Sequence, residues 1–389
     1  MMVQMKAFWR GAIGLALAGA AGSAVAQAKG AASAPALPAQ VSAALACKPG
    51  GACAARIPVK VVVVTMFEIG QDTGDAPGEF QFWRERRKLD VRIPFPQSHH
   101  DLYYNPKSQI LGMVTGMGSI RSATATLALG LDQRFDLSHA YWLVAGIAGV
   151  DPHQATIGSA VWAHYLVDGD LAHEIDAREM PPGWPSGYFP LNAKGPLDKH
   201  PQSAEEGEMF ALNAGLADWA YGLTKGITLP DSADLAKARA PYTDTPKALA
   251  APRVMTGDNL AAMTFWHGAM MTQWAHDWVD FWTGGKGTFV TSAMEETGTF
   301  QSIDYLSRVG RVDRNRVMVL RGASNFTMPP PGVSAATNLL KENESYSGMN
   351  ASLEALYTVG SKVVDTLLAD WPRYEKMPPQ VPAPKAPAQ

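Results

Sequence analysis

Cysteine is scarce in this chain of 389 residues, which contains only Cys47 and Cys53. Two thiols cannot complete a tetrahedral metal site without further ligands nearby, and "ACKPGGAC" supplies none, so we expect no metal. In an exported protein the pair favours a disulfide. Two free thiols in a flexible leader are the alternative.

An excess of basic charge and long apolar runs are also missing. The chain has 33 Lys and Arg against 36 Asp and Glu, which gives no electrostatic basis for binding nucleic acid. After the first segment no run reaches the ~20 apolar residues that a membrane-spanning helix needs. We therefore expect a soluble mature chain without a membrane span. No Gly-x-Ser-x-Gly sequence indicates a serine hydrolase.

The first segment has the pattern of a signal peptide. Lys6 and Arg10 precede an apolar stretch at 11–21, and Ala24 and Ala26 provide small residues at a cleavage site. The sequence therefore predicts removal of residues 1–26 and a periplasmic or secreted protein.

Composition divides the rest of the chain into three parts. Residues 27–55 are rich in Ala, Pro and Ser and predict a linker. Residues 56–372 carry the apolar patterns of one folded domain. Residues 373–389 form a Pro-rich tail that we expect to be extended or disordered.

Strands and helices alternate within 56–372. The β-branched run "VKVVVVTMFE" (59–68) is typical of a strand buried on both faces. Further strands are predicted at 110–118, 140–150, 158–167 and 316–324, and helices at 119–131, 260–282 and 350–371. This alternation indicates an α/β domain with a largely parallel sheet, in which ligands bind beyond the carboxyl ends of the strands.

Glycines gather at two of these strand ends. "TGMGSIRSA" (115–123) places Gly116 and Gly118 before a helix start, whose N–H groups can bind an anion. "VAGIAGVDP" (144–152) would let a flat ligand lie against exposed peptide. A tight turn explains either segment equally well. The candidate anion contacts are Ser119, Arg121 and Ser122.

Three polar positions could contact a ligand. Glu295 and Glu296 stand where a helix should begin, and a carboxylate there can grip a ribose diol or simply favour the positive helix start. Asn325 ends a strand and can offer a donor and an acceptor to a heterocycle, or mark a turn. Asp258, in "TGDNL", has the pattern of a helix-capping residue in a loop.

Taken in order, these segments resemble the purine nucleoside permease family, which is similar to the nucleoside phosphorylase and nucleosidase superfamily. The likeness covers most of 56–372 and implies a single nucleoside-phosphorylase-like domain, with a central mixed, largely parallel twisted sheet flanked by helices. Its landmarks are "VVVVTMFE", "TGMGSIRSA", "VAGIAGVDP" with "IGSAVW", "TGDNL", "AMEETG" and "VLRGASN".

The resemblance implies roles for individual residues. Met294 and Glu295 match a Met-Glu pair whose glutamate holds ribose hydroxyls. Asn325 stands where many relatives carry a purine-protonating aspartate and others an asparagine that suits 6-oxopurines. Glu68 lies within one position of a water-activating glutamate. The remaining implied ligand contacts are Gly146, Ile147 and Ala148 under the base, Gly118, Ser119 and Ser122 near phosphate or water, and Asp258.

Two functions follow from this resemblance. The first is an exported, soluble purine nucleoside-binding protein that assists uptake. The second is an enzyme that cleaves the N-glycosidic bond with phosphate or water, with a preference for 6-oxopurines. A scaffold with a decayed site is a third. No cofactor is expected, phosphate could serve as co-substrate, and relatives often form homo-oligomers. The arginine that phosphorylases carry after the first strand is missing from "MFEIGQDTG", which argues against tight phosphate binding there.

Overall fold

The computed structural model describes residues 37–47, 53–196, 198, 204, 206–342, 344 and 346–380. The predicted signal peptide and the last nine residues of the Pro-rich tail lie outside them. The chain divides after Leu37, and the account below concerns the unit that begins at Pro38. No helix among the described residues is long and apolar enough to cross a membrane.

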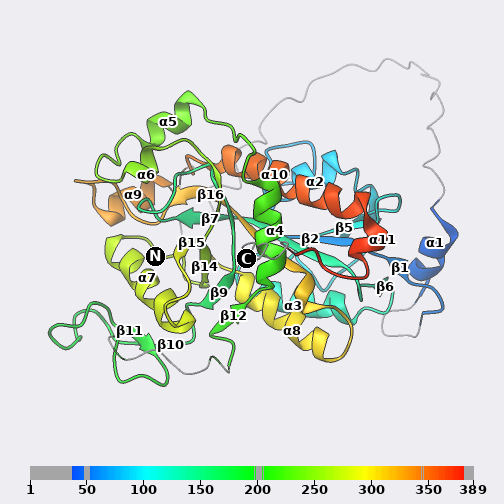
Figure 1. Ribbon diagram of the computed structural model, residues 1–389, viewed down its shortest axis with the longest axis horizontal. Coiled ribbons are helices and arrows are strands. Elements are labelled where there is room, and N and C mark those ends of the chain that lie inside the picture. Colours follow the sequence, from blue (N-terminus) through cyan, green and yellow to red (C-terminus); the bar gives the residue numbers. More distant parts are fainter. Residues whose placement is uncertain are drawn as a thin grey trace, which may run out of the picture. The chain divides into compact units, whose positions relative to one another are not determined.

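A mixed sheet forms the centre of the fold (Figure 1). Within the described residues twelve strands join it, and nine follow the order β12-β9-β14-β15-β7-β2-β5-β4-β3, while β16 pairs with β7 and β8, and β8 with β13. Their bounds are β2 Val61–Thr65, β3 Val91–Ile93, β4 Leu102–Asn105, β5 Ile110–Val114, β7 Tyr141–Val150, β8 Ala160–Trp162, β9 Tyr165–Asp168, β12 Met209–Ala211, β13 Val254–Thr256, β14 Asp258–Ala261, β15 Phe289–Ala293 and β16 Val317–Phe326.

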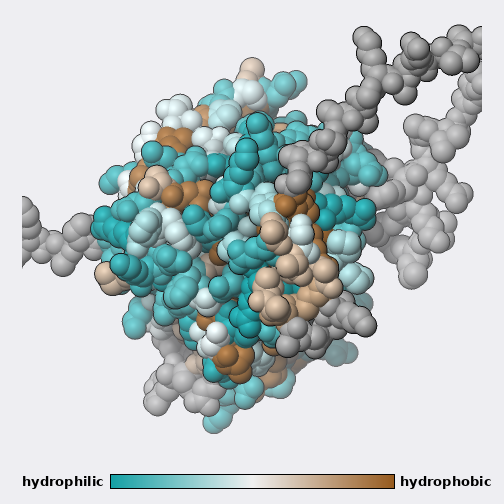
Figure 2. Space-filling model, turned by 90° about the vertical axis from the view of Figure 1, so that its right-hand side faces the viewer, coloured by the Kyte–Doolittle hydropathy of each residue, from teal (hydrophilic) through white to brown (hydrophobic). Residues whose placement is uncertain are grey.

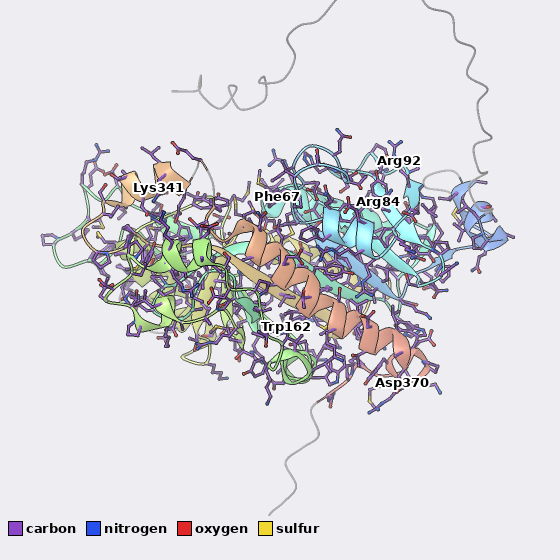
Figure 3. All side chains as sticks on the ribbon, turned by 90° about the horizontal axis from the view of Figure 1, so that it is seen from above. Phe67, Arg84, Arg92, Trp162, Lys341 and Asp370 are labelled. Carbon is purple, nitrogen blue, oxygen red and sulfur yellow. A yellow bond between two sulfur atoms is a disulfide. The ribbon has the colours of Figure 1, made fainter. Side chains whose placement is uncertain are left out.

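Helices cover both faces of this sheet. In Figure 1, α2 and α10 lie above it and α3 and α8 below it. Figure 3 shows α10 running across the sheet towards Asp370. The helices are α1 Ala39–Leu45, α2 Gln81–Arg86, α3 Ser119–Leu131, α4 Ala214–Thr224, α5 Ala233–Arg239, α6 Pro246–Leu249, α7 Ala269–Thr283, α8 Glu296–Arg308, the 3-10 turn η2 Arg314–Arg316, α9 Ala335–Glu342, α10 Met349–Ala369 and α11 Trp371–Tyr374.

Burial on both faces explains the composition of the central strands. Every residue of β2, β5 and β16 is buried, and so is β7 except for Ile147. β7 runs parallel to β2 and to β16, so the carboxyl ends of these three strands lie at one edge. The predicted α/β fold with a central mixed sheet is confirmed. Figure 2 shows a face outside this core that is largely hydrophilic with small apolar areas.

Two predicted elements have different bounds in the structure. The strand predicted at 158–167 is two strands, β8 and β9. The helix predicted at 260–282 begins only at Ala269, because residues 258–261 form β14 between β9 and β15 and Gly268 turns the chain with φ 133°. The apolar pattern over 260–282 predicts one helix, but its first residues belong to a buried strand.

Short helices with buried residues lie at both ends of the described chain. Helix α1 lies in the segment predicted as a linker, with Val41 and Ala44 buried. Cys47 and Cys53 form a disulfide with an S–S distance of 2.04 Å. At the other end Tyr374 is buried, and its carbonyl accepts hydrogen bonds from the Tyr141 hydroxyl and Arg316 Nη1, each at 2.7 Å. Two small sheets, β1 (Ile57–Pro58) with β6 (Phe135–Asp136) and β10 (Ala172–Glu174) with β11 (Tyr188–Pro190), complete the fold.

Close contact between α3 and α8 brings two distant segments together. A Cβ atom on Gly298 would lie 2.2 Å from the Ser119 carbonyl oxygen, so only glycine lets the two helices pack this tightly. The first turn of α8 therefore lies against the first turn of α3. This contact places Glu295 beside Gly118.

Candidate functional site

A cavity opens where the carboxyl ends of β2, β7 and β16 meet the loops after β14 and β15. It encloses about 860 Å³, counting the part open to solvent. Phe67, labelled in Figure 3, belongs to its wall. The other lining residues are Met66, Glu79, Met117, Ile147, Ala148, Gly149, Thr264, Phe265, Trp266, Ser292, Ala293, Met294, Glu295, Ser324, Asn325, Thr327, Tyr346 and Met349.

Glu295 presents its carboxylate to this cavity rather than to the helix that it precedes. One carboxylate oxygen accepts the Gly118 N–H at 3.1 Å, and the other accepts Arg321 Nη2 at 3.1 Å. The side chain makes no capping hydrogen bond to α8, although Glu295 is its N-cap residue. The residue is 4% exposed. The helix-start interpretation therefore does not describe Glu295, which is held in the cavity wall.

Arg321 is the counter-charge of this wall. It lies in the middle of β16 at 1% exposure, forms ion pairs with Glu295 and Glu296, and donates from Nη1 to the Ile147 carbonyl at 2.8 Å. Glu296 is fully buried, so it is not a solvated helix start either. Sequence reasoning missed this role of Arg321. The signal was a charged residue within a strand of apolar residues, where a buried partner is required.

Glu79 is a second carboxylate in the cavity. Its oxygens accept the N–H groups of Met66 and Ile147, each at 2.7 Å. Burial raises the pKa of Glu79 to about 7, against the opposing effect of the Arg321 charge. A carboxyl group with such a pKa can exchange protons near neutral pH.

Glu68, the predicted catalytic glutamate, lies outside the lining of the cavity. Its carboxylate accepts N–H groups from Gly78, Phe80 and Gln81, and so holds the loop that leads into α2. The chain folds back after this loop, so that the Glu79 N–H donates to the Phe67 carbonyl at 3.1 Å. The glutamate that reaches the cavity is thus eleven residues further along the chain than the one that sequence reasoning selected.

The glycine and serine positions near the cavity mostly support its wall. Ile147 and Ala148 line the cavity as predicted for the base platform, whereas Gly146 lies behind it. A Cβ atom on Gly146 would lie 2.2 Å from Arg321 Nη1 and 2.8 Å from Glu79 Oε1, so this glycine makes room for the charged groups. The Ser122 hydroxyl donates to the Glu295 carbonyl at 2.9 Å.

The predicted anion contacts at the start of α3 lie outside the cavity lining as well. Gly118 has φ 93° and uses its N–H for Glu295. Ser119 packs against Gly298 through its backbone. Arg121 donates to the Met117 carbonyl at 3.1 Å. These residues fix the Glu295 segment, and only Met117 of this loop reaches the cavity.

Asp258 lies outside the cavity lining, where it connects neighbouring strands. It begins β14, so the interpretation as a helix-capping loop residue is wrong. Its carboxylate accepts the N–H groups of His164, Tyr165 and Thr288 at 3.1, 2.8 and 2.6 Å, and thereby joins β9, β14 and the approach to β15. Burial raises its pKa.

Ser324 and Asn325 reach the cavity through an irregularity in β16. Ala323 pairs with Ala148 and Asn325 with Gly149, which leaves Ser324 as the extra residue of a bulge. The Ser324 hydroxyl donates to Asn325 Oδ1 at 2.8 Å. Asn325 is 5% exposed, and Ser324 is 1% exposed. A turn does not explain this pair, since both residues belong to a strand.

Aromatic rings also line the cavity. Phe265 and Tyr346 lie nearly parallel, at an interplanar angle of 6° with ring centroids 6.3 Å apart. Trp266 and Phe67 add further ring surface. Flat apolar surface beside a side-chain amide suits a heterocyclic base.

The described part of this lining holds no cationic side chain and no metal-binding cluster. None of the described lining residues is a lysine, arginine or histidine. Among the described residues, no group of His, Cys, Asp or Glu is arranged to hold a metal ion. The polar chemistry of the cavity therefore comes from two carboxylates, an amide and hydroxyl groups.

Known proteins with similar sequences include two purine nucleoside permeases of fungi. A purine nucleoside permease of Candida albicans is 29% identical over 324 residues, which are 82% of this chain and 77% of that protein. A probable purine nucleoside permease of Schizosaccharomyces pombe is 26% identical over 319 residues, covering 80% and 90%.

Solved structures with a similar fold include a futalosine hydrolase of Helicobacter pylori, at 14% identity and a TM-score of 0.46, covering 79% of this chain and 98% of that one. A 5'-methylthioadenosine/S-adenosylhomocysteine nucleosidase of Neisseria meningitidis has 13% identity and a TM-score of 0.45, covering 80% and 100%. The sequence model of the family described as purine nucleoside permease matches residues 58–379. This chain therefore belongs to the purine nucleoside permease family.

Proposed function

We propose that the cavity binds a purine nucleoside, with the ribose on Glu295 and the purine beside Asn325. The observation that carries the proposal is the position of the Glu295 carboxylate, which is buried in the cavity wall and makes no hydrogen bond to its own helix. Its Oε1 has a single donor among the described residues, the Gly118 N–H, so it retains acceptor capacity for hydroxyl groups.

The neighbouring charges support this assignment. An ionised carboxylate is costly to bury unless a cation compensates it, and Arg321 lies against Glu295 at 3.1 Å. Charge-assisted hydrogen bonds to a cis-diol are about twice as strong as neutral ones. The pair Glu295–Arg321 therefore keeps a strong acceptor in place before any ligand arrives.

Calorimetry with adenosine and inosine tests this proposal. Glu295→Ala should weaken binding by about 100-fold, because two charge-assisted hydrogen bonds are lost. Glu344→Gln, which changes an exposed residue, is the matched control. An unchanged dissociation constant in Glu295→Ala, or no binding by the unaltered protein at millimolar nucleoside, would reject the site.

Export and assisted uptake form the wider part of the proposal and rest on the N-terminal sequence pattern. In this role the protein captures nucleosides outside the cytoplasm and raises their availability for uptake. Mass spectrometry of the mature protein should find a chain that starts at Gln27. A full-length chain confined to the cytoplasm would contradict it.

A second candidate function, hydrolysis of the N-glycosidic bond, is favoured by Glu79. The Glu79 carboxylate would take a proton from water, and the water oxygen would bond to the anomeric carbon. The bond to the purine breaks at the same time, and the departing purine nitrogen keeps the electron pair and takes a proton from solvent. Positive charge on the sugar would be stabilised by Glu295. Phosphate is the alternative nucleophile, but a dianion would face two carboxylates without a cationic side chain in the described lining.

A turnover assay separates these functions. If the protein is a hydrolase, inosine or adenosine should yield free purine and ribose whether or not phosphate is present. Ribose 1-phosphate that forms only with phosphate would show a phosphorylase instead. Binding without any product would exclude hydrolysis and support the carrier function.

A further inference from the structure

A second cavity shares part of its wall with the proposed nucleoside cavity, since Thr264 and Trp266 line both. It encloses about 560 Å³, counting the part open to solvent, and is bordered by α7, by the loop after β14 and by the strands β10 and β11. In Figure 1 these two strands lie close to α7, and the rings of Tyr188 and Trp274 connect them at a centroid distance of 5.3 Å. We call this space the β10–α7 cavity.

Three aromatic side chains line the β10–α7 cavity. Trp266 and Trp274 meet at an interplanar angle of 88°, with ring centroids 5.8 Å apart, and Tyr188 lies at 45° to Trp274. The two tryptophans are 9% and 5% exposed, and neither indole N–H has a hydrogen-bond partner among the described residues. Because all three rings line one space at different angles, a cation in this space can lie within ~6 Å of each ring centroid, the range of a cation–π interaction.

Two carboxylates also line this cavity, and no cation compensates them within the described chain. Asp170 Oδ2 accepts the Met263 N–H at 2.8 Å, and Glu174 Oε1 accepts the Tyr188 hydroxyl at 3.0 Å. Neither carboxylate forms an ion pair with a described residue, and the described lining contains no Lys, Arg or His. Asp170 and Glu174 are both exposed, so a ligand that arrives from solvent meets negative charge.

The alternation of side chains along β10 directs Glu174 to this cavity and His173 away from it. Ala172 and Glu174 line the cavity, as expected for two residues on one face of a strand. His173, between them, packs its ring on Phe189 at a centroid distance of 4.8 Å, and its Nε2 lies 3.2 Å from the Leu191 carbonyl oxygen. The only histidine of β10 therefore does not neutralise the cavity.

We propose that the β10–α7 cavity binds a small organic cation that carries a quaternary ammonium group. The faces of aromatic rings attract a cation, and a quaternary ammonium has no N–H group that would need an acceptor when its methyl groups pack against the rings. The exposed carboxylates supply the opposite charge and raise the local concentration of cations. The inference does not depend on the proposed nucleoside binding, because Glu295 and Asn325 are not part of this lining.

Calorimetry with choline tests this inference. Choline should bind about tenfold more tightly than 3,3-dimethylbutanol, an uncharged molecule of the same shape, and more tightly than ethanolamine, whose ammonium group carries no methyl groups. Tyr188→Leu should weaken choline binding by about tenfold, because one ring is lost, whereas Tyr188→Phe keeps the ring and should retain the affinity. Asp170→Asn should weaken it by about two- to fivefold, as expected for an exposed charge.

The controls remove an exposed ring and an exposed carboxylate elsewhere, in Tyr305→Leu and Glu344→Gln, and should leave choline binding unchanged. Thermal unfolding shows whether each variant is folded. The inference is overturned if millimolar choline does not bind, if either comparison compound binds as tightly as choline, or if folded Tyr188→Leu and Asp170→Asn both bind choline normally. Glu295→Ala should retain choline binding whatever happens to adenosine, so that failure of this site is distinct from failure of the proposed function.

Discussion

The two halves of the cavity hold their polar groups in different ways. In the proposed sugar half Glu79 and Glu295 line the cavity, and Arg321 lies outside the lining with ion pairs to Glu295 and to the buried Glu296. The proposed base half consists of Ser324, Asn325 and the aromatic rings, which are neutral. Strong charge lies where hydroxyl groups would bind, and oriented dipoles lie where a base would be distinguished.

We expect the charged groups of the sugar half to determine mainly the stability of the fold, and the neutral groups of the base half to determine mainly ligand selectivity. Removing one charged group of the sugar half should destabilise the folded protein, because its partner would stay buried without a compensating charge. Groups in the base half can be exchanged at lower cost, since a neutral hydrogen bond contributes only about 0.5–1.5 kcal/mol. The predictions below test that separation, from the largest expected effect to the smallest.

Glu79→Gln should have the largest effect, on catalysis. If the protein hydrolyses nucleosides, loss of the general base should lower kcat by roughly 10²–10⁴-fold. The unaltered enzyme should gain kcat/KM as the pH rises through about 7, because only ionised Glu79 accepts a proton. Steady-state kinetics with inosine should show that this pH limb is absent in Glu79→Gln and retained in Glu344→Gln, which changes an exposed residue. A limb that persists in Glu79→Gln would assign the base to another group.

Arg321→Met should have the largest effect on folding. It leaves Glu295 and Glu296 buried without a counter-charge, which should cost about 3–5 kcal/mol of unfolding free energy. Arg308→Met is the matched control, because the Arg308 side chain is 67% exposed and its buried partner Asp304 keeps a second ion pair with Arg314. This change should cost less than about 1 kcal/mol. Equal losses in the two variants, measured by urea unfolding, would show that the charge cluster is not the main support of this wall.

Glu296→Gln should distinguish the two adjacent glutamates. Glu296 contacts Arg321 but lies outside the cavity lining. We therefore expect a stability loss of about 1–3 kcal/mol from a weakened charged hydrogen bond, with a nucleoside dissociation constant changed less than about threefold. Glu295→Gln should show the opposite balance, with affinity reduced more than stability. Identical behaviour of both variants in calorimetry and thermal unfolding would contradict the division of roles.

Ser324→Ala should have the smallest effect, confined to the base half. Its hydroxyl donates to Asn325 Oδ1, and a neutral hydrogen bond of this kind contributes about 0.5–1.5 kcal/mol. Affinity for adenosine should fall by about two- to tenfold, while affinity for ribose alone stays constant. A parallel loss for ribose would mean that the two halves do not act separately.

The sequence predicted the parts of the fold that local patterns determine. The β-branched run of β2, the helix at Ser119–Leu131 and the strand predicted at 316–324 were placed correctly, because burial on both faces of a strand and apolar periodicity on one face of a helix leave direct signals. The ligand-binding role predicted for Glu295 came from the family resemblance, because the local sequence around Glu295 is also typical of an ordinary helix start. Arg321 and Glu79 were missed, because their partners lie far along the chain and only the folded sheet brings them together. Asp258 was misread because a buried carboxylate that joins strands has the same local sequence as a helix cap.

The bulge at Ser324 has a consequence for how relatives of this protein can diverge. Strand neighbours point to opposite faces, so the extra residue shifts the last positions of β16 from one face to the other. Deleting a single residue there would exchange the side chain offered to the ligand without any substitution at position 325. Loss or gain of one codon is thus a short evolutionary path between different ligand preferences on an unchanged scaffold.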